Sequence, residues 1–230
     1  RRPDEGELLR LADAQQRTGN TAGYVATLEK LVLDYPKKEY WSAFLARLPR
    51  KAGFSQRYDI DVMRLRLATG TLTKTDEYME LAQLALQAGL PAEALRVIDQ
   101  GYKSGALGTG AEAPRHQRLR ELALKHLADA KASLGAQAAE AAAEKDGDQL
   151  VKIGYAYVSI GEVDKGLQLM QQGIAKGGLK RPDEARLRLG MAQLQSGKNR
   201  AQALQTLRGV KGSDGTADIA HLWTVVPNGG

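Results

Sequence analysis

The chain has 230 residues, a formal net charge of +6 and no cysteine, and 43% of its residues are apolar while only 5% are aromatic. The lack of cysteine excludes disulfides, zinc fingers and thiol catalysis. The apolar fraction allows a sizeable core, and the sequence holds no run of about 18 apolar residues, so we expect no membrane-spanning helix.

Pairs of small residues, seven positions apart, recur along the chain and predict a repeat protein. The pairs are Ala12 and Gly19, Ala82 and Gly89, Gly154 and Gly161, and Gly190 and Gly197. Further packing positions follow each pair, in the pattern of a helix, a turn and a second helix over about 34 to 36 residues. Such a repeat buries its apolar face only against its neighbours, so the repeats must stack.

In chain order, the apolar periodicity predicts six helix-turn-helix repeats and a C-terminal capping helix, thirteen helices in all, with almost no room for strands. The predicted repeats span residues 4–36, 38–70, 75–107, 111–146, 147–179 and 182–212, and the predicted cap spans 215–223.

Two of these repeats depart from the regular pattern. The second contains a loop from Pro49 to Gly53. The fourth joins a long helix, from about Pro114 to Leu134, to an alanine tract from Ala136 to Ala143, and we interpret it as a stretched repeat. The C-terminal residues 227–230 are expected to fray.

The spacing of small and large positions resembles the tetratricopeptide repeat. The best match is residues 147–178, whose packing positions hold Ile153, Gly154, Tyr157, Gly166, Met170 and Gly173. Residues 98–107 also align with residues 170–179 at an offset of 72, which indicates internal duplication. The resemblance implies an all-α fold, a right-handed α-solenoid forming a single domain over residues 1–230, that works as a non-catalytic scaffold binding a protein or peptide.

Three stretches, residues 22–32, 35–41 and 146–157, resemble a proteobacterial family of larger repeat proteins that are labelled as candidate components of TonB systems. This resemblance implies a periplasmic or envelope location and no catalytic residues. It also implies that the chain is the C-terminal part of a longer protein, cleaved or trimmed from a secreted precursor. Independently, the first residues lack the apolar core of a signal peptide.

In such arrays the first helix of each repeat lines the concave face, where recognition usually takes place. By register, the candidate partner-binding residues are Asp76, Met79, Gln83, Leu86, Val151, Tyr155, Val158, Leu187, Met191 and Leu194. Their apolar character would suit an extended peptide or an amphipathic helix. Alternatively, these side chains pack on neighbouring helices or on a preceding part of the protein.

Residues suited to catalysis, metal binding or cofactor binding are sparse. His116 and His126 lie ten positions apart on one predicted helix, which does not make them adjacent metal ligands. The glycine-rich stretches 105–110 and 173–180 follow predicted helices, whereas phosphate-binding loops follow strands. We therefore expect no catalytic residue, no metal and no cofactor.

The positive charge is concentrated in two segments. Residues 37–66 carry a net charge of +5 and residues 115–131 a net charge of +3. A basic helical scaffold can bind nucleic acid or an anionic surface through phosphate contacts. We keep this as the alternative function, although the few aromatic residues make nucleic acid a less favoured partner than a protein.

Overall fold

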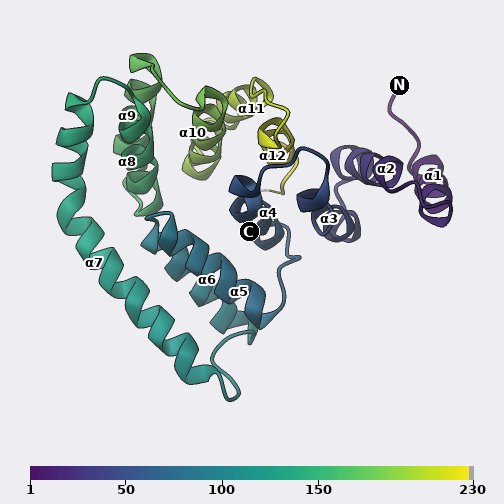
Figure 1. Cartoon of the computed structure of the whole chain (residues 1–230), viewed down its shortest axis with the longest axis horizontal. Coiled ribbons are helices and arrows are strands. Elements are labelled where there is room, and N and C mark those ends of the chain that lie inside the picture. Colours follow the sequence, from purple (N-terminus) through teal and green to yellow (C-terminus); the bar gives the residue numbers. More distant parts are fainter. Residues whose placement is uncertain (228–230) are drawn as a thin grey trace. The chain divides into compact units, whose positions relative to one another are not determined.

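The computed structural model describes residues 1–227, and every regular element within that range is a helix (Figure 1). The all-α prediction is confirmed, and the helical pairs are consistent with an α-solenoid. The chain divides into two compact units: unit 1 is Arg1–Leu72 with Lys211–Gly230, and unit 2 is Thr73–Val210. The predicted fraying of residues 228–230 lies outside the described range. The assembly of the repeats into a single right-handed superhelix stays a prediction.

Unit 1 is built from consecutive helices that pack against their neighbours in sequence. Its helices are α1 (Glu5–Arg17), α2 (Thr21–Asp34), α3 (Lys38–Leu45), α4 (Asp59–Ala68) and α12 (Thr216–Trp223), with short 3₁₀ turns at Leu48–Arg50 and Gln56–Tyr58. Trp41, Phe44 and Leu65 lie in its core, each at most 1% exposed. The irregular second repeat is thus a helical pair around two 3₁₀ turns.

The C-terminal helix α12 packs against α4, far from it in sequence. The Ser55 amide donates to the Asp214 carbonyl at 2.8 Å, and the hydroxyls of Thr216 and Tyr58 are hydrogen-bonded at 2.6 Å. The Asp214 carboxylate accepts hydrogen bonds from Thr216, which lower its pKa. The helix predicted at 215–223 is therefore present, and these contacts make it part of the core of unit 1.

Unit 2 contains three helical hairpins and one long helix. Its helices are α5 (Thr75–Gln87), α6 (Pro91–Ser104), α7 (Ala113–Ala143), α8 (Asp148–Ser159), α9 (Val163–Lys176), α10 (Pro182–Ser196) and α11 (Arg200–Arg208). The hairpins pair α5 with α6, α8 with α9 and α10 with α11. Their turns contain Gly89, Gly161 and Gly197, with φ angles of 76°, 94° and 67°. Glycine is favoured there because side chains make this backbone conformation costly.

Helix α7 corrects the prediction for residues 111–146. It is one continuous helix of 31 residues that packs against both α6 and α8 (Figure 1). The described residues accordingly form twelve α-helices, and the prediction of thirteen was wrong. Gly135 does not break the helix, because no turn-forming residue accompanies it and the alanine-rich tract that follows has the highest helix propensity.

Glycines bring α8 and α9 into backbone contact. A Cβ atom on Gly154 would lie 2.6 Å from the Gly166 carbonyl oxygen, and one on Gly147 would lie 1.7 Å from that of Gly173. These distances are shorter than van der Waals contact, so the helices can approach this closely only without side chains. The same approach encloses an apolar cluster that includes Val158 and Met170.

We predict opposite effects for two helical Gly→Ala substitutions in unit 2. Gly154→Ala forces a methyl group against backbone atoms and should lower the free energy of unfolding by about 2–3 kcal/mol. Gly135→Ala adds a methyl group where no atom lies within 4 Å and should raise it by about 0.5–1 kcal/mol. Urea unfolding followed by circular dichroism measures both, and a neutral Gly154→Ala would contradict the packing described.

Candidate functional site

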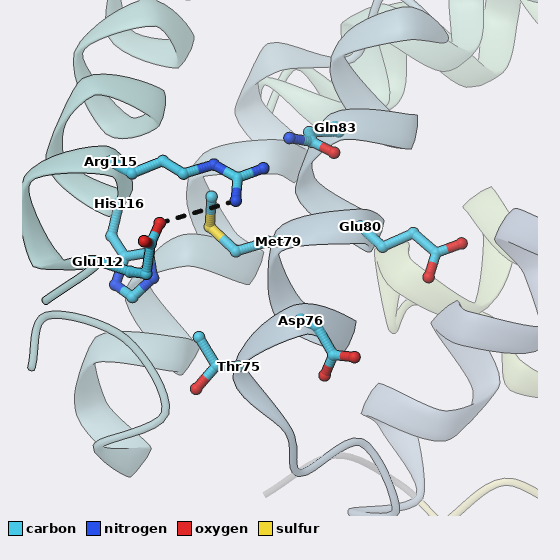
Figure 2. Close-up of a pocket in the computed structure, with 8 residues that line it drawn as sticks. All are labelled: Thr75, Asp76, Met79, Glu80, Gln83, Glu112, Arg115 and His116. Carbon is cyan, nitrogen blue, oxygen red and sulfur yellow. Dashed lines mark ion pairs between the residues drawn. The ribbon is translucent and has the colours of Figure 1, made fainter. Parts of the chain in front are cut away.

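A pocket of about 390 Å³ lies between α5 and the first turn of α7, within unit 2 (Figure 2). Its lining residues are Thr75, Asp76, Met79, Glu80, Gln83, Glu112, Arg115 and His116. The residues from α5 lie in two adjacent rows, each with a spacing of three or four positions, so they share one face of that helix. The others belong to the turn that begins α7.

Hydrogen bonds fix the start of α5 at the edge of this pocket. The Glu77 carboxylate accepts from the Lys74 amide at 2.9 Å, as in a capping box. The Thr75 hydroxyl donates to the Ala106 carbonyl at 2.6 Å, which ties α5 to the loop before α7. The start of α5 is therefore held against the loop that leads from α6 into α7.

His116 is the most deeply buried polar residue of the lining, with 2% of its surface exposed. Its Nδ1 accepts a hydrogen bond from the Gly108 amide at 3.0 Å. In a neutral imidazole the ring proton must then lie on Nε2. Within residues 1–227 the Nε2 atom has no protein hydrogen-bond partner, and it is not among the buried side-chain atoms left without one, so solvent can reach it.

The pocket carries more negative than positive formal charge. Asp76, Glu80 and Glu112 contribute three carboxylates, and Arg115 contributes one guanidinium group. The Arg115 guanidinium lies 3.8 Å from the Glu112 carboxylate, and both side chains are more than half exposed. Figure 2 shows the carboxylates of Asp76 and Glu80 pointing to the same side of α5. The buried Met79 supplies an apolar wall between these polar groups.

Three of the predicted partner-binding residues come together in this pocket. Asp76 is exposed, Gln83 is half-buried and Met79 is buried, and all three line the cavity. Leu86, one turn further along α5, is half-buried and does not line it.

The predicted residues of α8 and α10 mostly belong to the protein core. Val151 and Val158 lie in the apolar cluster with Met170, and Tyr155 packs against that cluster. Val158 and Leu187 have no exposed surface. For these side chains the alternative interpretation, packing on neighbouring helices, describes what the structure shows.

The remaining predicted residues lie on α10. Met191 is 8% exposed and Leu194 is half-buried. A contact between a partner and the accessible parts of Tyr155 or Leu194 stays a prediction. Partner binding at the predicted positions of α8 and α10 stays a prediction, and Val158 and Leu187 have no accessible surface to contribute to it.

Sequence reasoning missed five of the lining residues: Thr75, Glu80, Glu112, Arg115 and His116. Glu80 follows Asp76 by one helical turn, and this spacing could have placed it beside the predicted face. Glu112, Arg115 and His116 could be predicted only if the path of the loop 105–112, which brings the start of α7 next to α5, were known. The sequence contains no local signal for that return.

Many side chains of the basic segment 37–66 are engaged within unit 1. Lys37 lies 2.6 Å from Glu5, and its hydrogen bond is the main cause of the lowered pKa of Glu5. Lys51 lies 3.2 Å from Asp218 and 3.7 Å from Glu29. These contacts reduce the charge that the segment presents to a polyanion.

The other cations of the basic segments show similar contacts. Arg64 is 7% exposed and lies 3.2 Å from the buried Asp61, while the Arg47 guanidinium stacks 5.0 Å from the centre of the Tyr24 ring. In the segment 115–131, Arg120 lies 3.0 Å from Asp99. Both basic segments therefore contain cations that take part in contacts within the protein.

Residues 1–227 contain neither a candidate metal cluster nor a candidate membrane-spanning helix. That part of the chain has no group of three or more His, Asp or Glu side chains placed to hold a metal ion. None of its helices is both long enough and apolar enough to cross a bilayer.

Comparison with known families identifies two segments of the chain as matches to the tetratricopeptide repeat, residues 8–38 and 184–213. The first covers most of α1 and all of α2 in unit 1, and the second covers most of α10 and all of α11 in unit 2. Together they span about a quarter of the chain, and they support a tetratricopeptide repeat protein. No curated protein and no solved structure matches the chain. The similarity to TonB-labelled proteins thus stays a prediction.

We predict that the two histidines of α7 differ sharply in their effect on stability. His116→Leu removes the acceptor of the Gly108 amide and should lower the free energy of unfolding by about 1–2 kcal/mol. His126→Leu alters an exposed position on the same helix and should change it by less than about 0.5 kcal/mol. Equal effects of the two variants in urea unfolding would contradict the structural role of His116.

Proposed function

We propose that the protein is a non-catalytic scaffold that binds an extended peptide segment of a partner protein along α5 and the start of α7. The pocket between these helices carries the proposal, because its lining combines the apolar side chain of Met79 with carboxylates and the imidazole of His116. A peptide offers matching groups, since its side chains and backbone carbonyls alternate along an extended chain.

The chemistry of the lining supports binding rather than catalysis. The Thr75 hydroxyl donates to the Ala106 carbonyl, and His116 Nδ1 is occupied by the Gly108 amide. The described lining residues therefore do not pair a nucleophile with a general base, as hydrolytic or transfer chemistry requires. Tetratricopeptide repeats in general act as protein-interaction scaffolds, and the two matched segments support the same function here.

A matched pair of Gln→Arg substitutions tests the location of the binding site. Short peptides selected from a random library on the whole chain should bind less tightly to Gln83→Arg, because the longer side chain fills the pocket, and we expect a loss of about tenfold or more. Gln137→Arg makes the same change on an exposed part of α7 outside the pocket and should leave affinity unchanged. Fluorescence anisotropy measures both.

Failure to select any peptide would contradict the scaffold function, and equal binding by both variants would contradict the site. If the chain instead bound single-stranded nucleic acid more tightly than any peptide, with a steep loss at high salt, the alternative function would hold.

We further propose an envelope location, which is supported by the resemblance of residues 22–32, 35–41 and 146–157 to TonB-labelled repeat proteins. Fractionation of the native host cells, with an antibody against this chain, should recover the protein in the periplasmic or membrane fraction. Recovery in the cytosol alone would contradict the location and leave the peptide-binding proposal intact.

A further inference from the structure

We infer that α7 is a dimerisation helix, whose exposed face packs antiparallel against the same face of a second copy of the chain. This inference goes beyond the peptide-binding function and concerns a different face of the helix. It is carried by two exposed leucines and by the distribution of side-chain size and charge along α7, which is complementary to a second copy only in the antiparallel direction.

One face of α7 is exposed along the whole helix, and we call it the outer face. Helix α7 packs against α5, α6 and α8 through its other face, which buries Ala123 and Leu134 (Figure 1). Leu122 and Leu124 border the outer face at 45% and 49% exposure, and they are two of the four large apolar side chains exposed in residues 1–227. Apolar side chains gathered on one helix face indicate a surface that binds another protein.

Beyond the two leucines, the outer face is lined by small residues. These exposed residues are Ala128, Ala132, Gly135, Ala136, Ala139 and Ala143. In an antiparallel pair, the leucines of each copy lie against the small residues of the other, so both halves of the helix make contact. In a parallel pair, the leucines would face one another and hold the alanine-rich halves apart.

The charges of α7 are distributed in the same way. Residues 115–125 carry a net charge of +3, and residues 139–148 carry a net charge of −3. Arg118 and Lys125 near one end, and Glu140 and Glu144 near the other, are exposed and form no ion pair within residues 1–227. An antiparallel pair places each basic end beside an acidic end, whereas a parallel pair would bring like charges together. Charge complementarity therefore favours a second, antiparallel copy.

Size and charge together define how the two helices are aligned. With Leu122 level with Ala142 of the second copy, Lys125 is level with Ala139 and lies one residue from Glu140 along the helix. Ala132 is then level with its own copy, at the two-fold axis. Because α7 is continuous over its 31 residues, contact from residue 121 to residue 143 extends about 30 Å. An interface of two single helices is small, and we expect a dissociation constant on the order of 10 µM.

Sedimentation equilibrium of the whole chain tests the dimer and its location. Leu122→Glu places a carboxylate beside Glu140 of the second copy and should weaken dimerisation by about tenfold or more. Leu9→Glu makes the same change at a leucine of α1 that is 43% exposed, and it should leave dimerisation unchanged. Circular dichroism verifies that both variants keep their helices.

Single cysteines test the alignment, because the chain contains no cysteine of its own. Under mild oxidation, Ala132→Cys should form a disulfide between two copies, since the two positions meet at the axis. Ala139→Cys lies about 20 Å from its own copy and should not cross-link alone. It should cross-link when it is mixed with Lys125→Cys, because positions 139 and 125 are level.

Three outcomes overturn the inference. A chain that stays monomeric at 200 µM does not dimerise through any face. A dimer that Leu122→Glu and Leu9→Glu weaken equally, or that neither weakens, is formed elsewhere. Disulfide formation by Ala139→Cys alone, as efficient as that by Ala132→Cys, indicates a parallel pair. Each of these outcomes leaves the peptide-binding proposal intact, since that proposal is tested by peptide affinity at the pocket between α5 and α7.

Discussion

The structure of unit 2 depends on the close approach of helices at small residues. Where Gly147, Gly154, Gly166 and Gly173 face one another, the backbones of α8 and α9 meet without intervening side chains. This geometry buries the side chains on either side of the crossing, among them Val158 and Met170. Because an amphipathic helix is stabilised mainly by packing, the crossings hold the α8–α9 hairpin together and present its outer face to the helices next to it.

The candidate site arises where this regular packing changes. The loop from Gly105 to Glu112 links the hairpin of α5 and α6 to the long helix α7. Two hydrogen bonds fix that loop. His116 Nδ1 accepts one from the Gly108 amide, and the Thr75 hydroxyl donates the other to the Ala106 carbonyl. The pocket is therefore placed by hydrogen bonds to a loop, and its lining combines two helices that do not form a hairpin with each other.

Much of the fold could be predicted from the sequence because local rules determine it. The glycines at positions 89, 161 and 197 lie in the turns of the hairpins, as the repeat pattern predicts. Pro91 and Pro182 begin α6 and α10, where proline is well tolerated. The continuity of α7 could not be predicted, because a glycine followed by alanines permits both a break and a continuous helix. In the structure α7 is continuous and packs against both α6 and α8.

The candidate site was predictable only in part, for a related reason. The register of α5 placed Asp76, Met79 and Gln83 on one face, and the structure brings these three residues together. On α8 and α10, the same register reasoning could not distinguish an exposed apolar face from a buried one. Val158 and Leu187 are apolar side chains of the core and have no exposed surface. Tertiary contacts decide that difference, and a repeat pattern in the sequence does not contain them.

We propose that α5 and the start of α7 form a peptide-binding site. The most direct test is a titration of the isotopically labelled chain with a selected peptide, followed by nuclear magnetic resonance. We expect shifts concentrated at residues 75–83 and 112–116, which line or flank the pocket. Shifts confined to other helices, with residues 75–83 and His116 unchanged at saturation, would contradict it.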